Sequence, residues 1–381
     1  MSGGGIHALG DDALVQILVR LPSVSVLRCR AVCKDWRRVT VDRSFLAAHA
    51  ANRPLEMIVQ SSFPHWTVEA IPLDDPAQLT DRFLCYYAPS ADVRNVLYSL
   101  HGLLVLAQHH GFFVICNPTT RQWTNLPELG QQSYCAVFEC GFYFHSFSGE
   151  YRLLCHAVEI APEEYNNRFD PDTKRYYYIL SAGAILPRRL GRAPSSSGNL
   201  SYEVPVAHRG TLHWLSKHPQ ANRTGKMLAF DTTFETFRLM SGPLLDDTMR
   251  TTLFELDGEL GVAAMQSLTS LDIWVLQDYK AETWTLCHRV DVPMPIFHYH
   301  HQISVSKVIS VGNGAILIGA PNCEVARMYH LKEKRVICRD FTFNVARTAT
   351  FLVFNESLVP HTFFDSPRCP NLETIYFSIK S

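Results

Sequence analysis

The chain has 381 residues, of which 47% are hydrophobic, and this size and composition suit a globular protein with more than one domain. Its 35 basic and 36 acidic residues nearly cancel, so a basic surface for nucleic acid or membrane is not expected. Apolar runs such as 103–107 are too short to cross a bilayer, and the N-terminal MSGGGIHALGDD lacks a secretion pattern. These features predict a protein of the cytoplasm or nucleus, or of both, without nucleic-acid or membrane partners.

Residues 9–49 predict a compact group of three or four short helices. Asp11 and Asp12 offer carboxylate oxygens that can cap the first helix. Pro22 ends this helix, and Ser23 or Ser25 can cap the next one. The apolar positions recur at helical spacing; they are Leu14, Ile17, Leu18 and Leu21, then Val24, Leu27, Ala31 and Val32, then Trp36 and Val39, and finally Phe45, Leu46 and Ala50. So short a segment cannot bury this many large side chains by itself, which predicts a docking surface.

The run LGDDALVQILVRLPSVSVLRCRAVCKDWRRV resembles the F-box in its acidic start, its Leu-Pro break and its RAVCKDW helix. This resemblance implies docking onto the Skp-type adaptor of cullin-RING ubiquitin ligases. By position, it assigns the adaptor-facing role to Leu9, Leu14, Ile17, Leu18, Leu21, Pro22, Leu27, Val32, Cys33 and Trp36. The family usually has Leu-Pro before the acidic pair, where this chain has Leu9-Gly10, and the missing proline predicts a softer helix start. The alternative is a small helical cap that packs only on its own C-terminal domain.

Two domains are expected, an F-box domain at residues 6–50 and a second domain at residues 54–381. Beyond residue 53, helical spacing gives way to short β-branched and aromatic runs between turn residues, the pattern of antiparallel strands. The clearest runs are 56–60, 103–107, 112–116, 212–215, 227–230, 273–277, 315–318 and 349–354. No convincing long helix is found in this region.

The strands repeat in a way that selects an architecture. One anchor is a glycine that opens a strand pair, and it occurs in HGLLVL at 101–106, RGTLHW at 209–214, DGELGV at 257–262 and NGAILI at 313–318. A second anchor has a turn residue six positions before an apolar one, as in NPTTRQW at 117–123, DTTFETF at 231–237, DYKAETW at 278–284 and, more weakly, HLKEKRV at 330–336. A further unit is expected around Gly149, with its second half displaced to residues 176–180.

Glycines 102, 149, 210, 258 and 314 recur at intervals of about 45 to 60 residues, which suits four-stranded propeller blades. The predicted fold is therefore α+β and multidomain, with a three-to-four-helix F-box followed by an all-β propeller of about six blades, seven being the alternative. Residues 349–354 are expected to complete the first blade beside residues 57–60 and so remove an open sheet edge. Trp123 and Trp284 are expected to pack between blades. The line GLLVLAQHHGFFVICNPTTRQWTNLPEL resembles a blade of plant F-box-associated propellers, and a large β-sandwich is the alternative.

Catalytic, metal and cofactor motifs are not apparent. The chain has no GxSxG, HExxH or Walker sequence, and its acidic residues sit mostly in turns or beside basic ones. The 11 cysteines lack paired zinc spacing, and buried, reduced thiols explain them best. His298, His300 and His301 form a cluster without a nearby acidic or cysteine ligand in the sequence, which favours a solvated loop. We expect no cofactor, no metal and no enzymatic activity of the chain itself.

The resulting hypothesis is a substrate-recognition subunit of an SCF-type, cullin-RING ubiquitin ligase. Its expected partners are the Skp-type adaptor, cullin through that adaptor, and a protein target held by the propeller for ubiquitination. Residues 159–177 and 190–199 are candidate recognition loops, with a solvated insertion as the alternative. Two other functions stay open: a propeller that senses a glycan or small molecule, and an F-box protein with a structural role that delivers no target.

Overall fold

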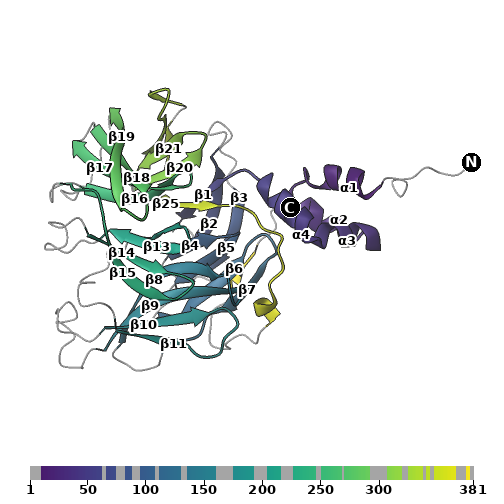
Figure 1. The fold of residues 1–381 in the computed structure, drawn as a ribbon. Coiled ribbons are helices and arrows are strands. Elements are labelled where there is room, and N and C mark those ends of the chain that lie inside the picture. Colours follow the sequence, from purple (N-terminus) through teal and green to yellow (C-terminus); the bar gives the residue numbers. More distant parts are fainter. Residues whose placement is uncertain are drawn as a thin grey trace, which may run out of the picture.

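The computed structural model describes residues 10–61, 66–73, 82–87, 95–107, 111–129, 135–159, 175–192, 204–215, 226–245, 250–267, 270–291, 307–319, 325–337, 340–343, 347–365 and 375–377. Within these residues, four α-helices come first, and they are α1 (Asp11–Leu18), α2 (Ser23–Cys29), α3 (Lys34–Val41) and α4 (Arg43–Ala51). Six antiparallel sheets follow, and the helices lie to one side of them (Figure 1). The prediction of a helical module followed by a six-bladed propeller is confirmed.

Each sheet is one blade, and its strands follow one another in hydrogen-bonded order. The first blade contains β25 (Arg347–Phe354), β1 (Glu56–Ser61), β2 (Thr67–Pro72), β3 (Arg82–Tyr87) and β26 (Ile375–Tyr376). The second contains β4 (Asn95–Leu100), β5 (Leu103–Ala107), β6 (Phe113–Asn117) and β7 (Gln122–Asn125). The third contains β8 (Cys135–His145), β9 (Glu150–Glu159), β10 (Arg175–Ser181) and β11 (Arg188–Arg192). The displaced unit predicted around Gly149 is this third blade.

The remaining three blades complete the ring. The fourth contains β12 (Val206–His208), β13 (Thr211–Leu215), β14 (Lys226–Asp231) and β15 (Thr236–Ser241). The fifth contains β16 (Arg250–Leu256), β17 (Glu259–Ser267), β18 (Ser270–Asp278) and β19 (Thr283–Asp291). The sixth contains β20 (Lys307–Gly312), β21 (Ala315–Gly319), β22 (Val325–His330) and β23 (Arg335–Val336), and β24 (Phe341–Thr342) also pairs with β22. A short 3₁₀ helix, η4 (Thr362–Asp365), follows β25.

The first blade is closed by a strand from the far end of the chain. Strand β25 pairs with β1, with Val353 opposite Met57 and Thr348 opposite Gln60. This is the predicted closure, and it is confirmed. Because β1 is hydrogen-bonded on both sides, by β25 and by β2, it leaves no open edge.

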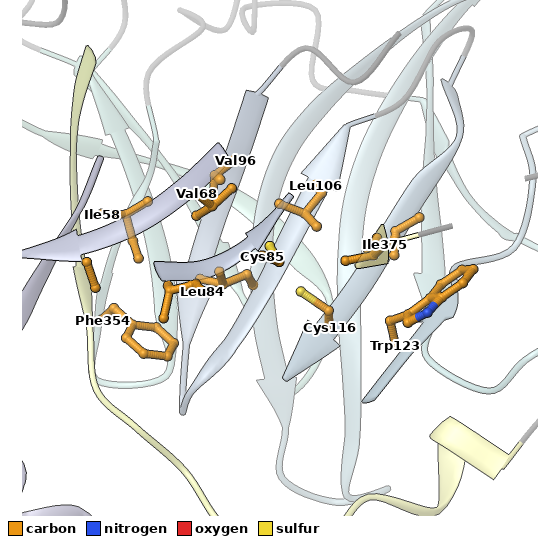
Figure 2. Close-up of a cluster of buried hydrophobic side chains, with 13 residues drawn as sticks. Ile58, Val68, Leu84, Cys85, Val96, Leu106, Cys116, Trp123, Phe354 and Ile375 are labelled. Atoms are coloured by element: carbon orange, nitrogen blue, oxygen red, sulfur yellow. The ribbon is translucent and has the colours of Figure 1, made fainter. Parts of the chain in front are cut away.

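The blades pack face to face through large apolar clusters. Between the first and second blades, Ile58, Leu84 and Phe354 meet Leu106, Cys116 and Trp123, all of them buried (Figure 2). Trp284 is half-buried against the cluster between the fourth and fifth blades, and its indole N–H donates to the Ser241 carbonyl at 2.9 Å. Both tryptophans therefore pack between blades, as predicted.

Of the seven cysteines whose burial is described, four are buried as predicted, Cys29 and Cys33 are half-buried, and Cys287 is exposed. Cys85, Cys116, Cys140 and Cys155 are buried and form no disulfide bond, and burial raises the pKa of the Cys116 thiol. Cys287 is free but exposed. It lies on β19, the outermost strand of the fifth blade, where residues of one face meet solvent instead of the next blade. Cys338 lies outside the described residues.

Turn chemistry explains both repeating anchors. In the first anchor, the residue before the glycine and the glycine itself both have positive φ, as at His101 (52°) and Gly102 (79°). A two-residue hairpin turn of this kind matches the strand twist, and glycine adopts it without strain. In the second anchor, the Asp231 carboxylate accepts the backbone N–H groups of Thr233 and Phe234, at 2.8 and 2.9 Å. Asn117 and Asp278 do the same in their turns.

The strand order places the helices and these turns at the same end of the blades. Strand β1 begins at Glu56, directly after the helices, and Glu56 lies opposite Phe354 at the end of β25. The first turn of the second blade is at this end, because Gly102 contacts Ser357 just after β25. Because neighbouring strands of a blade are antiparallel, the third turn of each blade lies at the same end as its first turn. The chain leaves β9 at Glu159 and β11 at Arg192 on the opposite end, so the proposed recognition loops begin away from the helices; most of their residues lie outside the described ones.

Gly102 should tolerate no side chain. A Cβ there would lie 2.3 Å from the Ser357 Cβ, whereas a Cβ at Gly258, which has φ +86°, would meet nothing within 4 Å. We expect Gly102→Ala to lower the free energy of unfolding by about 3 kcal/mol or more, from overpacking added to left-handed strain. Gly258→Ala should cost only the strain, about 1 to 2 kcal/mol. Urea denaturation of both variants measures the difference, and equal losses would contradict the close approach.

Acid should weaken the contact between the fourth and fifth blades. His213 is fully buried, its Nε2 lies 2.9 Å from the Tyr279 hydroxyl, and burial lowers its pKa from 6.5 to about 4. The unfolded chain therefore takes up the proton first. Stability is full above pH 6.5 and falls as the pH drops toward 4, by about 3 kcal/mol for this residue. Urea denaturation between pH 7.5 and 4.5 should show a steeper loss for wild type than for His213→Gln; identical slopes would exclude His213 as the cause.

Candidate adaptor-binding surface

The four helices enclose a small apolar core. Leu14 and Leu18 of α1, Val26 of α2 and Phe45 of α4 are all at most 5% exposed and belong to one cluster. His49 on α4 is buried beside them, and its Nε2 donates to the Leu21 carbonyl at 3.0 Å. Burial lowers the pKa of His49, so this side chain is neutral in the core at pH 7.

The helix starts differ from the sequence prediction. The N-cap of α1 is Gly10, and no side chain caps it. Asp11 instead pairs with Arg38 at 2.7 Å and ties the start of α1 to α3; both side chains are more than half exposed. This hydrogen bond raises the pKa of Arg38. Asp11 is the first residue of α1 and lies past the cap position, so its carboxylate faces Arg38 and does not cap the helix.

The second predicted cap is also wrong, and a third cap was missed. Pro22 is the N-cap of α2, and Ser23 is its first helical residue. Asp42 is the N-cap of α4, and its carboxylate accepts the backbone N–H groups of Ser44 and Phe45. Hydrogen bonds from the hydroxyl and amide of Ser44 lower the pKa of Asp42. The sequence signal was present, since Asp is a preferred N-cap residue directly before RSFL.

Some large apolar side chains of the helical module point into solvent, from α1, from α2 and from the turn between α2 and α3. Ile17 is 49% exposed, Val24 45% and Val32 59%. Val41, at the end of α3, is also exposed. Covering each of them with a partner would stabilise the complex by about 1 to 2 kcal/mol at this partial exposure. Ile17, Val24 and Val32 are called the exposed helical triad below.

The candidate residues named from the sequence divide by burial. Ile17, Pro22 and Val32 are exposed, Leu21, Leu27, Cys33 and Trp36 are half-buried, and Leu14 and Leu18 are core residues. Leu9 lies outside the described residues. Val24 was not among the candidates, although helical spacing contains the signal: Ser23 and Val26 are buried in α2, which turns Val24 outward. Contact with the adaptor stays a prediction for each of the candidate residues and for Val24.

The described residues offer neither a metal-binding cluster nor a membrane-spanning helix. No group of three or more His, Cys, Asp or Glu residues there could hold a metal ion. His298, His300 and His301 lie outside these residues. Within the same ranges, no helix is both long and apolar enough to cross a membrane. The exposed apolar side chains of the helices are therefore the feature on which a functional interpretation rests.

Comparison with known families assigns both parts of the chain. Residues 7–49 match the family described as F-box-like, and residues 53–366 match the F-box associated beta propeller domain. The chain belongs to the F-box proteins with an associated propeller. It is of the substrate-receptor type, in which the F-box implies a Skp-type adaptor as partner, and F-box proteins are generally non-catalytic.

Curated relatives are F-box proteins of Arabidopsis thaliana. F-box protein At3g07870 is 26% identical over 314 residues, which cover 77% of this chain and 75% of the relative. F-box protein At5g49610 is 23% identical, covering 74% of this chain and 79% of the relative. F-box protein At3g57590 is also 23% identical, covering 73% and 71%. In each case the match covers more than two thirds of both proteins.

Solved structures are more distant. An oligogalacturonate lyase from Vibrio parahaemolyticus superposes with a TM-score of 0.48 and 8% identity, covering 76% of this chain and 74% of the lyase. A chain of a nidogen–laminin complex has a TM-score of 0.46 and 9% identity, covering 77% and 96%. Similarity at this level supports no functional inference.

The glycine at the start of α1 has the geometry of a proline. Gly10 has φ −60° and ψ 156°, and a Cβ there would meet nothing within 4 Å. Proline is favourable at such a φ and reduces the freedom of the unfolded chain. We expect Gly10→Pro to raise the free energy of unfolding by about 0.4 to 1 kcal/mol, as measured by thermal unfolding. A loss of stability would contradict this expectation. It would show that the folded chain needs the N–H of residue 10, or that the residue before it has a conformation that a following proline disfavours.

Proposed function

We propose that this chain is the substrate-recognition subunit of an SCF ubiquitin ligase. The observation that supports this proposal is the exposed helical triad on an F-box fold. Ile17, Val24 and Val32 expose apolar surface that the chain's own core does not cover. A Skp-type adaptor would bury this surface and connect the chain to cullin.

The propeller would then hold a protein target for ubiquitination. Proximity is the mechanism, because a bound target presents its lysines at high effective concentration to ubiquitin carried by the ligase. The chain itself would perform no chemical step. We also propose that it acts in the cytoplasm or nucleus, since an odd number of cysteines without paired spacing suits a reducing compartment.

Substitutions in the exposed helical triad test adaptor binding without disturbing the core. We expect Ile17→Asp and Val32→Asp each to weaken the affinity for a purified Skp-type adaptor by 10-fold or more, on the order of 1.5 to 3 kcal/mol. Calorimetry or biolayer interferometry measures this change. Leu14 and Leu18 are less suitable positions, because an aspartate there would disrupt the helical core.

Ile185→Asp is the matched control. Ile185 is 90% exposed in the turn between β10 and β11 of the third blade, so this change adds the same charge on the propeller, outside the four helices. Its affinity should equal that of wild type. If wild type itself does not bind the adaptor, or if the control loses as much affinity as Ile17→Asp, the proposal fails.

A further inference from the structure

The chain that leaves the closing strand β25 returns to the helices. Residues 355–365, here called the return segment, run along the side of the propeller that faces α1–α4 (Figure 1). Leu358 in this segment is 2% exposed and belongs to the helical core cluster with Leu18, Val26 and Phe45. A residue from beyond the propeller thus fills a position inside the F-box.

Glu356 joins the helices to the first blade. One carboxylate oxygen accepts the Ser23 hydroxyl at 2.5 Å, at the start of α2. The other pairs with Arg82 of β3 at 2.8 Å. Arg82 also pairs with Glu56 at the start of β1. Since the Glu356 side chain is only 14% exposed, these bonds are poorly screened by water.

Two further bonds hold the return segment on the helices. The Asn355 amide donates to the Ala50 carbonyl in α4 at 3.2 Å. The Arg30 guanidinium donates to the Leu358 carbonyl at 3.4 Å and to the Thr40 carbonyl at 3.0 Å. Backbone and side chain of the return segment are therefore both engaged by the helical module.

The second and third blades hold the same segment from the other side. The Asn117 amide donates to the Ser357 carbonyl at 3.0 Å, next to the close approach at Gly102. Further along, the His361 ring stacks on Phe363 and packs edge-on against Tyr151 of β9. The segment is fixed to blades and helices at once.

We infer that the return segment is a structural part of the F-box and fixes its orientation on the propeller. Two passages of chain connect the helices to the blades, residues 52–55 directly and residues 355–358 by return. Arg53 strengthens the direct one by donating to the Val19 and Arg20 carbonyls. One flexible connection would allow the helices to rotate, whereas two bonded connections prevent it. The consequence for ubiquitin transfer, a fixed geometry between adaptor and target, rests on the proposed function.

Hydrogen exchange in the free, full-length chain tests the inference. Leu358→Ala should accelerate amide exchange in α1, α2 and α4 by about 30-fold or more, the effect of removing a buried leucine from a core. Exchange in β16–β19 of the fifth blade should not change. Val359→Ala is the matched control. Val359 is the next residue in the chain, but its side chain is 38% exposed and does not belong to the helical cluster. The helices of this control should exchange at the wild-type rate.

Glu356→Gln supplies a milder variant should Leu358→Ala fail to fold. It keeps the shape and removes the charge that Ser23 and Arg82 contact, and we expect about 10-fold faster exchange in α2. Wild-type exchange in the helices of a folded Leu358→Ala chain, or of Glu356→Gln, would overturn the inference. The exchange experiment contains no adaptor, so its result does not depend on adaptor binding. A chain that binds no adaptor can still show that the return segment holds the helices on the propeller.

Discussion

The pairing of β25 with β1 is the interaction on which the other features depend. It joins the two ends of the propeller, and within it the Thr350 hydroxyl bonds to the Ile58 carbonyl 292 residues earlier in the sequence. Joining such distant segments costs about 5 kcal/mol of loop-closure entropy beyond a constant, by the logarithmic dependence on loop length. The strand pairing and the buried cluster around Phe354 offset this cost. Once the pair has formed, the chain beyond Phe354 emerges beside the helices.

This placement explains how so short a helical module is completed. Its core depends on Leu358, and its position depends on the bonds of Glu356 to Ser23 and Arg82. What remains uncovered is the exposed helical triad. The surplus of apolar side chains in the helical segment thus divides into two groups. One group is covered by the chain's own C-terminal region, and the other faces solvent, where an adaptor can bind.

Local sequence signals predicted the propeller well because its turns are encoded locally. Gly102 and Asp231 each impose a turn through their own backbone or side-chain chemistry, so the repeat could be found without knowing the neighbours. The closure at β25 followed from a strand that had no unit of its own. The helical module was harder to predict. Ser23 suits a cap by residue type, yet its hydroxyl bonds to Glu356, a partner 333 residues away.

The candidate surface shows the same limit. Helical spacing identified Leu18 and Ile17 as apolar positions, but it could not say that Leu18 is buried in one cluster with Leu358 while Ile17 faces solvent. The family resemblance named residues of both kinds as adaptor-facing. Burial now separates them, since only an exposed side chain can add new contact area without opening the core.

Site-specific photocrosslinking is the most direct test of the exposed helical triad as the docking site. A photoreactive residue would replace Val24 in one chain and Ile185 in another, and each chain would be irradiated with the Skp-type adaptor. The account predicts adaptor crosslinks from position 24 and none from position 185. Crosslinks from position 185 with none from position 24 would contradict it and place the adaptor on the propeller.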